Sequence, residues 1–198
     1  MYKYVQMLTA LLTSPGVIFH EYAHKEAAES QNMKVSEVCY FQFGDPAGYV
    51  THQSPKSYTG MFIISAAPFI LNTSFAFTIF FSASAYIQSV GYASLTRVPI
   101  VLLGVLTWIG ICLCLHAFPS PQDISNIRDS AKRKWSQKPF GILGTPIFLV
   151  RQFSIILSLP IILILVLLNK FRRFGSNIAF TIGVAYLAHI TTQMTIIS

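Results

Sequence analysis

The sequence predicts an all-α polytopic membrane protein of about five transmembrane helices, with a small β-hairpin inserted after the first. Of its 198 residues, 53% are hydrophobic and only 11% are charged, a composition outside the range of ordinary soluble domains. Mostly apolar runs recur, several of them about twenty residues long, the length needed to cross about 30 Å of hydrocarbon. They cover residues 4–19, 61–81, 98–118, 153–168 (extended back toward Pro146) and 178–197.

The chain carries 14 Lys and Arg against 7 Asp and Glu. In a soluble protein this excess would suggest nucleic acid, but in a membrane protein it sets orientation, so we expect no nucleic-acid partner. One side of the five-span arrangement collects Lys25, Lys34, Lys56, Arg128, Lys132, Arg133, Lys134 and Lys138; the other collects Lys3, Arg97, Lys170, Arg172 and Arg173. The richer side is predicted to be cytoplasmic, which leaves the N-terminus outside the cell membrane.

Turn and helix signals organise the rest of the chain. Ser14-Pro15-Gly16 predicts a fresh helix start inside the first apolar run, with Ser14 as its cap. The β-formers of residues 38–43, the turn cluster 44–48 and residues 49–51 predict the hairpin. Residues 123–135 are polar and basic, and two interpretations stay open: a surface helix held near anionic lipid headgroups, or a solvated charged loop.

The first helix carries a metal-binding pattern. His20-Glu21-Tyr22-Ala23-His24 fits H-E-x-x-H, in which two histidines at i and i+4 share one helix face and can bind one ion. The glutamate between them is then placed as a general base. The pattern predicts a zinc site with His20 and His24 as ligands and Glu21 as a catalytic residue. The bland alternative is the polar end of an interfacial helix.

A catalytic zinc usually has three protein ligands, so a third must come from downstream. No glutamate follows Glu37, which leaves Asp45, Asp123, Asp129, His52, His116 and His189. Asp123 is favoured because it follows the third apolar run across the Pro119-x-Pro121 break, which can turn the chain back toward the site. Ser120-Pro121-Gln122-Asp123 also reads as a helix cap with an acidic third position. His116, slightly earlier, is the reserve ligand.

Four elements in order resemble the site-2 protease family of intramembrane zinc metalloproteases. His20–His24 is similar to its zinc motif, Pro46-Ala47-Gly48-Tyr49-Val50 to its "GGYV" hairpin element, Ala66-Ala67-Pro68 through Asn72 to "AGPxxN", and residues 116–123 to "NxxPxPxLDG". The last element is one residue shorter than the family pattern, lacks its leucine and glycine, and has His116 at the asparagine position. No family motif is identified in the last two apolar runs.

The resemblance implies one membrane-embedded domain over residues 1–198, with a zinc metalloprotease core over 1–123 and two further transmembrane helices over 144–198. It implies Zn²⁺ held by His20, His24 and Asp123, with Glu21 as the base and the active site toward the cytoplasmic side. A second catalytic role is expected for His116, as a hydrogen-bond donor to the oxyanion or the substrate backbone. The expected substrate is a transmembrane or membrane-proximal protein segment. The competing hypothesis is a non-proteolytic metal-binding membrane protein or transporter with the same site.

Overall fold

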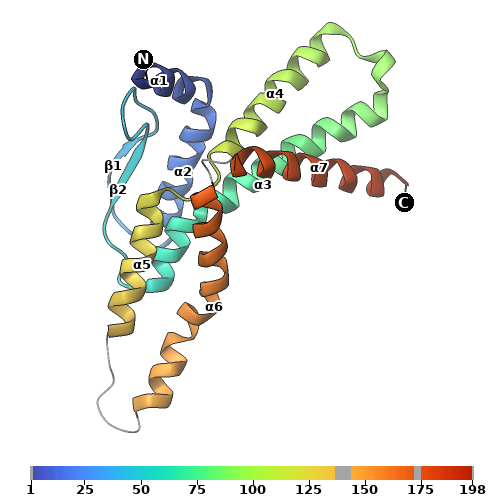
Figure 1. The fold of residues 1–198 in the computed structure, drawn as a ribbon. Helices are drawn as coiled ribbons and strands as arrows, with labels where there is room; N and C mark the ends of the chain where they lie inside the picture. The colour runs from blue at the N-terminus through green and yellow to red at the C-terminus, as the bar shows by residue number, and fades with distance from the viewer. Residues whose placement is uncertain (1, 137–143, 172–174, 198) are drawn as a thin grey trace.

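The computed structural model describes residues 2–136, 144–171 and 175–197, and it is mostly helical with one small hairpin, as predicted (Figure 1). The helices are α1 Tyr2–Leu12, α2 Ser14–Ser30, α3 Tyr58–Val90, α4 Arg97–Leu115, α5 Pro121–Ser136, α6 Gly144–Lys170 and α7 Ser176–Ile197. The strands are β1 Val35–Cys39 and β2 Tyr49–His52, and a 3-10 turn, Tyr92–Ser94, joins α3 to α4.

The first apolar run is divided between two helices. Helix α1 ends at Leu12 and α2 begins at Ser14 with Pro15 in its first turn, so the predicted helix start is present. The predicted cap is wrong by one residue: Thr13 occupies the cap position, and its hydroxyl donates backward to the Thr9 carbonyl at 2.8 Å. At 11 residues, α1 is about 17 Å long, too short to cross a bilayer alone.

Two helices of the described residues, α3 and α4, are long and apolar enough to cross a membrane by length and composition. Helices α6 and α7 cover the fourth and fifth predicted runs with 27 and 22 residues. Lys138, Arg172 and Arg173, which the orientation argument uses, lie outside the described residues.

The hairpin is antiparallel, with Val38 opposite Val50 and Cys39 opposite Tyr49. Its first strand starts earlier than predicted and stops at Cys39 rather than at residue 43. Beyond Cys39 the chain turns: the Gln42 amide donates to the Ala47 carbonyl at 2.7 Å. Residues 40–48 therefore form a long loop although several of them are good strand formers.

Three apolar clusters hold the helices together in two arms that meet near the middle of α3 (Figure 1). Ala23, Ala27 and Ala28 of α2 pack against Ile64 and Ala67 of α3. A second cluster joins Tyr58 of α3, Ile127 of α5 and Ile155 of α6. The third joins the far half of α3 to α4 and α7 through Ala76, Phe80, Leu113, Cys114, Val184 and Ala188. The first two clusters position the elements that carry the predicted metal site.

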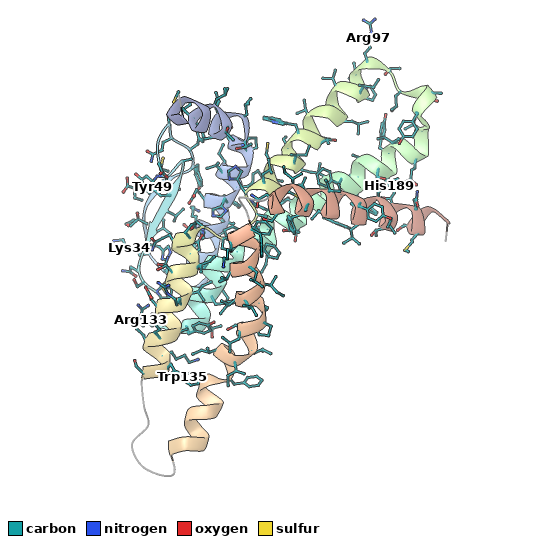
Figure 2. All side chains as sticks on the ribbon, viewed as in Figure 1. Lys34, Tyr49, Arg97, Arg133, Trp135 and His189 are labelled. Atoms are coloured by element: carbon teal, nitrogen blue, oxygen red, sulfur yellow. The ribbon has the colours of Figure 1, made fainter. Side chains whose placement is uncertain are left out.

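Residues 121–136 form a helix, which decides between the two interpretations of this segment in favour of the helical one. Its buried face carries Ile127, while Lys132 and Arg133 are exposed. The Lys134 ammonium lies 5.6 Å from the centre of the Tyr58 ring, a cation–π contact with α3. Figure 2 shows Arg133 on the arm that holds the hairpin and α5, and Arg97 at the far end of the other arm.

Candidate metal centre

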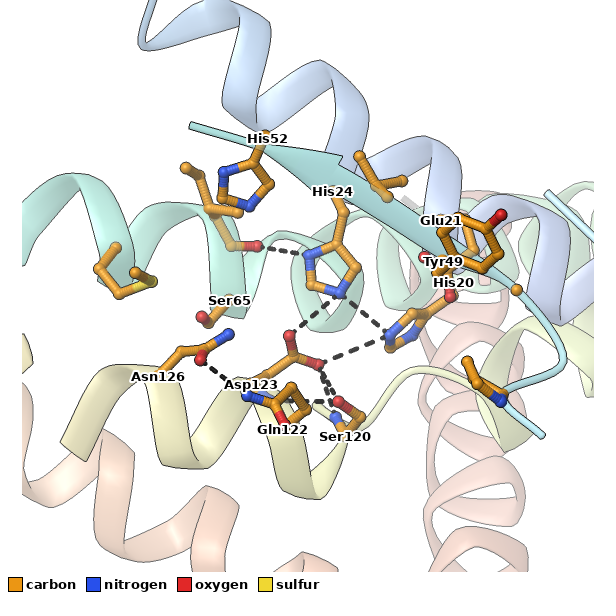
Figure 3. Close-up of a pocket in the computed structure, with 15 residues that line it drawn as sticks. His20, Glu21, His24, Tyr49, His52, Ser65, Ser120, Gln122, Asp123 and Asn126 are labelled. Atoms are coloured by element: carbon orange, nitrogen blue, oxygen red, sulfur yellow. Dashed lines mark hydrogen bonds and ion pairs between the residues drawn. The ribbon is translucent and has the colours of Figure 1, made fainter. Parts of the chain in front are cut away.

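The structure brings together the three predicted ligands, His20 and His24 from α2 and Asp123 from α5 (Figure 3). The two Nε2 atoms of the histidines are 3.2 Å apart. The His24 Nε2 lies 3.3 Å from Asp123 Oδ1, and the His20 Nε2 lies 3.8 Å from Asp123 Oδ2. All three residues are less than a tenth exposed, at 9%, 8% and 7%. Among the described residues, this is the group of three with the spacing of a metal site.

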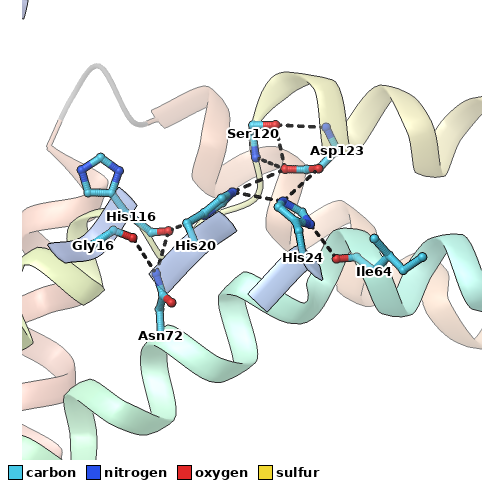
Figure 4. A network of polar contacts seen from close by, with 8 residues as sticks. All are labelled: Gly16, His20, His24, Ile64, Asn72, His116, Ser120 and Asp123. Atoms are coloured by element: carbon cyan, nitrogen blue, oxygen red, sulfur yellow. Dashed lines mark hydrogen bonds and ion pairs between the residues drawn. The ribbon is translucent and has the colours of Figure 1, made fainter. Parts of the chain in front are cut away.

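Backbone carbonyls fix the orientation of both imidazoles (Figure 4). The His20 Nδ1 lies 2.8 Å from the His116 carbonyl oxygen, and the His24 Nδ1 lies 3.0 Å from the Ile64 carbonyl oxygen. Because a carbonyl can only accept, each Nδ1 must carry the proton, and each Nε2 is left with its lone pair toward Asp123. This is the arrangement that metal-binding histidines adopt, with the second nitrogen held by a carbonyl.

Asp123 reaches the site from the first turn of α5, where it also caps the helix. Its Oδ2 accepts hydrogen bonds from the Ser120 amide and hydroxyl, both at 2.7 Å, and the Ser120 hydroxyl accepts from the Asp123 amide at 3.2 Å. The two alternatives considered for Asp123, ligand and cap, are therefore compatible. Burial raises the pKa of the Asp123 carboxyl, but His20 and His24, which donate to it when their imidazoles are doubly protonated, outweigh burial and hold that pKa well below its usual range.

The donor set fits a tetrahedral zinc ion. Ligand atoms at about 2.0–2.1 Å from such an ion lie about 3.3–3.4 Å from one another. The distances of 3.2 Å between the histidines and 3.3 Å between His24 and Asp123 match this edge length, while the 3.8 Å between His20 and Asp123 is longer. At this separation the two nitrogen lone pairs and the carboxylate repel one another. A proton or a metal ion between them can supply the positive charge that offsets this repulsion. Two imidazoles and one carboxylate leave a fourth position open, as in catalytic zinc sites.

Glu21 lies beside the three residues and lines the same cavity, which has a volume of about 230 Å³. The walls of this cavity come from α2, β2, α3 and α5. Gly48, at the end of the hairpin loop, approaches Glu21 so closely that an added Cβ would lie 2.7 Å from its Cγ. The hairpin therefore restricts where the Glu21 side chain can lie.

His116 contributes its carbonyl to the site, while its ring lies elsewhere (Figure 4). It stands at the C-terminal cap of α4, and its Nε2 lies 2.8 Å from the Thr13 hydroxyl, at the break between α1 and α2. His116, the reserve ligand, is therefore not part of the group formed by His20, His24 and Asp123. Its expected role as a donor to substrate stays a prediction, now with Thr13 as a competing partner.

The other candidate ligands lie outside the group. Asp129 forms an ion pair with Arg128 at 3.6 Å, as expected for a solvated pair. Asp45 is in the hairpin loop, and His52 lines the cavity from β2. The His189 ring contacts Ser84 and Gln193 at 3.0 and 3.1 Å, far along α7.

Asn72 of α3 supports the site from behind His20. It is fully buried, and its amide nitrogen donates to the His116 carbonyl at 3.2 Å and the Gly16 carbonyl at 3.4 Å. The same His116 carbonyl holds His20, so Asn72 links α3 to the second coordination sphere. The sequence signal was its place in the motif that begins at Ala66.

Comparisons of the chain with protein-family models, with curated proteins and with solved structures gave no match.

Proposed function

We propose that the protein is an intramembrane zinc metalloprotease that hydrolyses peptide bonds in transmembrane or membrane-proximal segments of other proteins. One observation carries the proposal: the Nε2 lone pairs of His20 and His24 and the carboxylate of Asp123 converge, with Glu21 on the same cavity. The order of the four sequence elements supports placing the chain in the site-2 protease family.

The residues of the site support a simple hydrolysis. His20, His24 and Asp123 would hold a zinc ion, which would supply the Lewis acidity that makes water a nucleophile at neutral pH. Glu21 accepts a proton from that water as the water oxygen bonds to the peptide carbonyl carbon. When the C–N bond breaks, Glu21 returns the proton to the leaving nitrogen, so the products are a carboxylic acid and an amine.

The hairpin supplies a means of holding an extended substrate. A transmembrane helix hides its amides in internal hydrogen bonds, so a segment must unwind before its peptide bonds become accessible. Strand β2 lines the cavity through Tyr49, Val50 and His52, and a two-stranded sheet has edges that can pair with such a segment. Edge pairing would place the unwound backbone next to Glu21.

The proposal includes a multi-pass arrangement in the cell membrane. The first membrane segment would consist of α1 and α2, and the others would be α3, α4, α6 and α7. The distribution of basic residues places the N-terminus outside and the active site toward the cytoplasmic side. The exposed Lys132 and Arg133 of α5 would then lie against anionic lipid headgroups.

The test uses purified full-length protein and Glu21→Gln, with zinc content measured on both. The probes are single-span helical peptides that carry a fluorophore and a quencher, reconstituted in liposomes with the protein. We expect one equivalent of zinc in both proteins and cleavage by the wild type alone. Cleavage by Glu21→Gln would refute the assignment of the base. Stoichiometric zinc without cleavage of any peptide by the wild type would favour the metal-binding or transport hypothesis.

A further inference from the structure

Peptide hydrolysis places negative charge on the carbonyl oxygen, and a hydrogen-bond donor aimed at that oxygen accelerates the reaction. Most side chains of the cavity already use their donors. Both donors of Ser120 bind Asp123, and the Tyr49 hydroxyl donates to the Glu37 carboxylate at 2.6 Å. These groups are therefore engaged before substrate arrives.

The remaining polar side chains of the cavity leave one strong candidate. The His52 Nδ1 donates to the Gln53 carbonyl at 2.8 Å, so the Nε2 of the neutral ring can only accept. Ser65 also lines the cavity but is 1% exposed, so its single hydroxyl is less open to substrate than the half-buried Asn126. Gln122 donates through Nε2 to the Asn126 Oδ1 at 3.0 Å. Asn126 itself has an amide nitrogen with two hydrogens.

The position of Asn126 suits a donor. It stands three residues after Asp123, on the same face of α5, and lines the cavity with the three metal-site residues. The hydrogen bond from Gln122 turns its oxygen away from the site, and Figure 3 shows its amide nitrogen on the side of Asp123 and Ser65. Figure 3 also shows Glu21 on the opposite side of Asp123, beside Tyr49.

From this geometry we propose that Asn126 donates a hydrogen bond to the carbonyl oxygen of the scissile peptide bond, across the site from Glu21. The inference rests on the proposed proteolysis and adds a catalytic residue to it. Gln122 is then a positioning residue, because its only proposed action is to orient the Asn126 amide. No proton is transferred by Asn126: it stabilises the charge that develops on the oxygen while Glu21 handles the protons.

The experiment compares the wild type with Asn126→Ala and with Asn126→Asp, which keeps the acceptor for Gln122 but lacks the N–H donors. Ser125→Ala, on the same helix and outside the cavity lining, is the matched control. Three quantities are measured: zinc content, the turnover of a fluorogenic single-span peptide, and the affinity for a phosphinic analogue of that peptide. The tetrahedral P–O⁻ group of the analogue mimics the developing oxyanion.

We expect zinc content to stay unchanged in all variants and kcat to fall about 100- to 1,000-fold in Asn126→Ala and Asn126→Asp. Their affinity for the phosphinic analogue should fall as well, while Ser125→Ala behaves as wild type. An Asn126→Ala protein within about threefold of wild type in both measurements would overturn the inference and leave the protease proposal standing. A wild type that neither cleaves the peptide nor binds the analogue would overturn both. Analogue binding that depends on Asn126 without any cleavage would overturn the protease proposal and, with it, the catalytic role of Asn126.

Discussion

The Asp123 carboxylate performs two tasks with its two oxygens. Oδ2 receives two hydrogen bonds from Ser120 at the start of α5, while Oδ1 lies 3.3 Å from the His24 Nε2. The cap holds the carboxylate in one orientation, so little side-chain entropy remains to be lost when a cation binds. The same contacts that start its helix would thus preorganise the aspartate for its proposed role as a ligand.

Removing the ligand and removing its support should have separable effects. Asp123→Ala eliminates one of the three proposed ligands, so we expect a purified protein with little or no zinc. Ser120→Ala keeps the carboxylate but removes the hydroxyl that orients it, and we expect zinc affinity to fall about 10- to 100-fold. Both are checked by competition with a zinc chelator of known affinity. Equal zinc affinity in Asp123→Ala and wild type would contradict the ligand assignment.

At the residue scale, the sequence predicted the three side chains of the candidate metal site but not the backbone carbonyls that orient the two imidazoles. The H-E-x-x-H spacing identifies His20 and His24, and the proline break before Asp123 brings in the third residue. The carbonyls of His116 and Ile64 were not predictable, because every residue has a carbonyl and only the helix crossing decides which one meets an imidazole. The direction of the His116 ring depends on the same crossing.

At the scale of elements, the hairpin loop controls the position of the proposed base. A methyl group at Gly48 would lie 2.7 Å from Glu21 Cγ and 3.0 Å from the Tyr40 carbonyl oxygen. Gly48→Ala should therefore displace Glu21 or the loop and lower kcat at least about 10-fold, with zinc content unchanged. Gly44→Ala, where the nearest atom to the added methyl would be 3.7 Å away, is the control in the same loop. Equal turnover of the two variants would show that the loop does not position the base.

The crossing of α2 and α4 depends on a glycine. A Cβ at Gly16 would overlap the carbonyl group of Cys112 and approach the His116 ring at 2.8 Å. Gly16→Ala should force the helices apart and lower the free energy of unfolding by about 1–3 kcal/mol. Gly104→Ala, on α4 with no atom within 4 Å of the added methyl, should be neutral or slightly stabilising. Unfolding in mixed detergent micelles measures both, and similar stabilities would contradict the tight crossing.

Strand and helix boundaries followed the sequence where local signals dominate. Pro15 marks the new helix, and Ser57 caps α3 by accepting from the Gly60 amide. The hairpin strand was predicted too late in the chain because residues 40–43 have strand-forming side chains. Their backbone instead closes a loop through Gln42 and Ala47, a contact that propensity does not report.

At the scale of the whole molecule, the helical class was predictable because apolar length and low charge are properties of long segments. The number of membrane spans was less predictable. Helices α3 and α4 have the length and composition of membrane-spanning helices, while the first apolar run is divided at Thr13. Pro15 indicated the new helix, but apolar length alone counted the two helices as one span.

The proposed orientation predicts that the turn between α3 and α4 and the end of α5 lie on opposite sides of the membrane. Tyr92, 78% exposed, lies in the turn between α3 and α4, and Trp135, 52% exposed, lies near the end of α5. After alanine replaces Cys39, Cys112 and Cys114, a membrane-impermeant maleimide should label Tyr92→Cys in intact cells. Trp135→Cys should be labelled only after the membrane is permeabilised. The reverse pattern would invert the topology.

The proposed ligand set, drawn from α2 and α5, has a consequence for biosynthesis. A ribosome that has released only the segment before Asp123 has exposed two imidazoles and no third ligand. The hairpin, α3 and α4 must therefore be in place before a metal ion can be captured firmly. Under the proposed function, nascent chains interrupted upstream of α5 would lack the third ligand, and peptide hydrolysis would be delayed until most of the polypeptide has been synthesised.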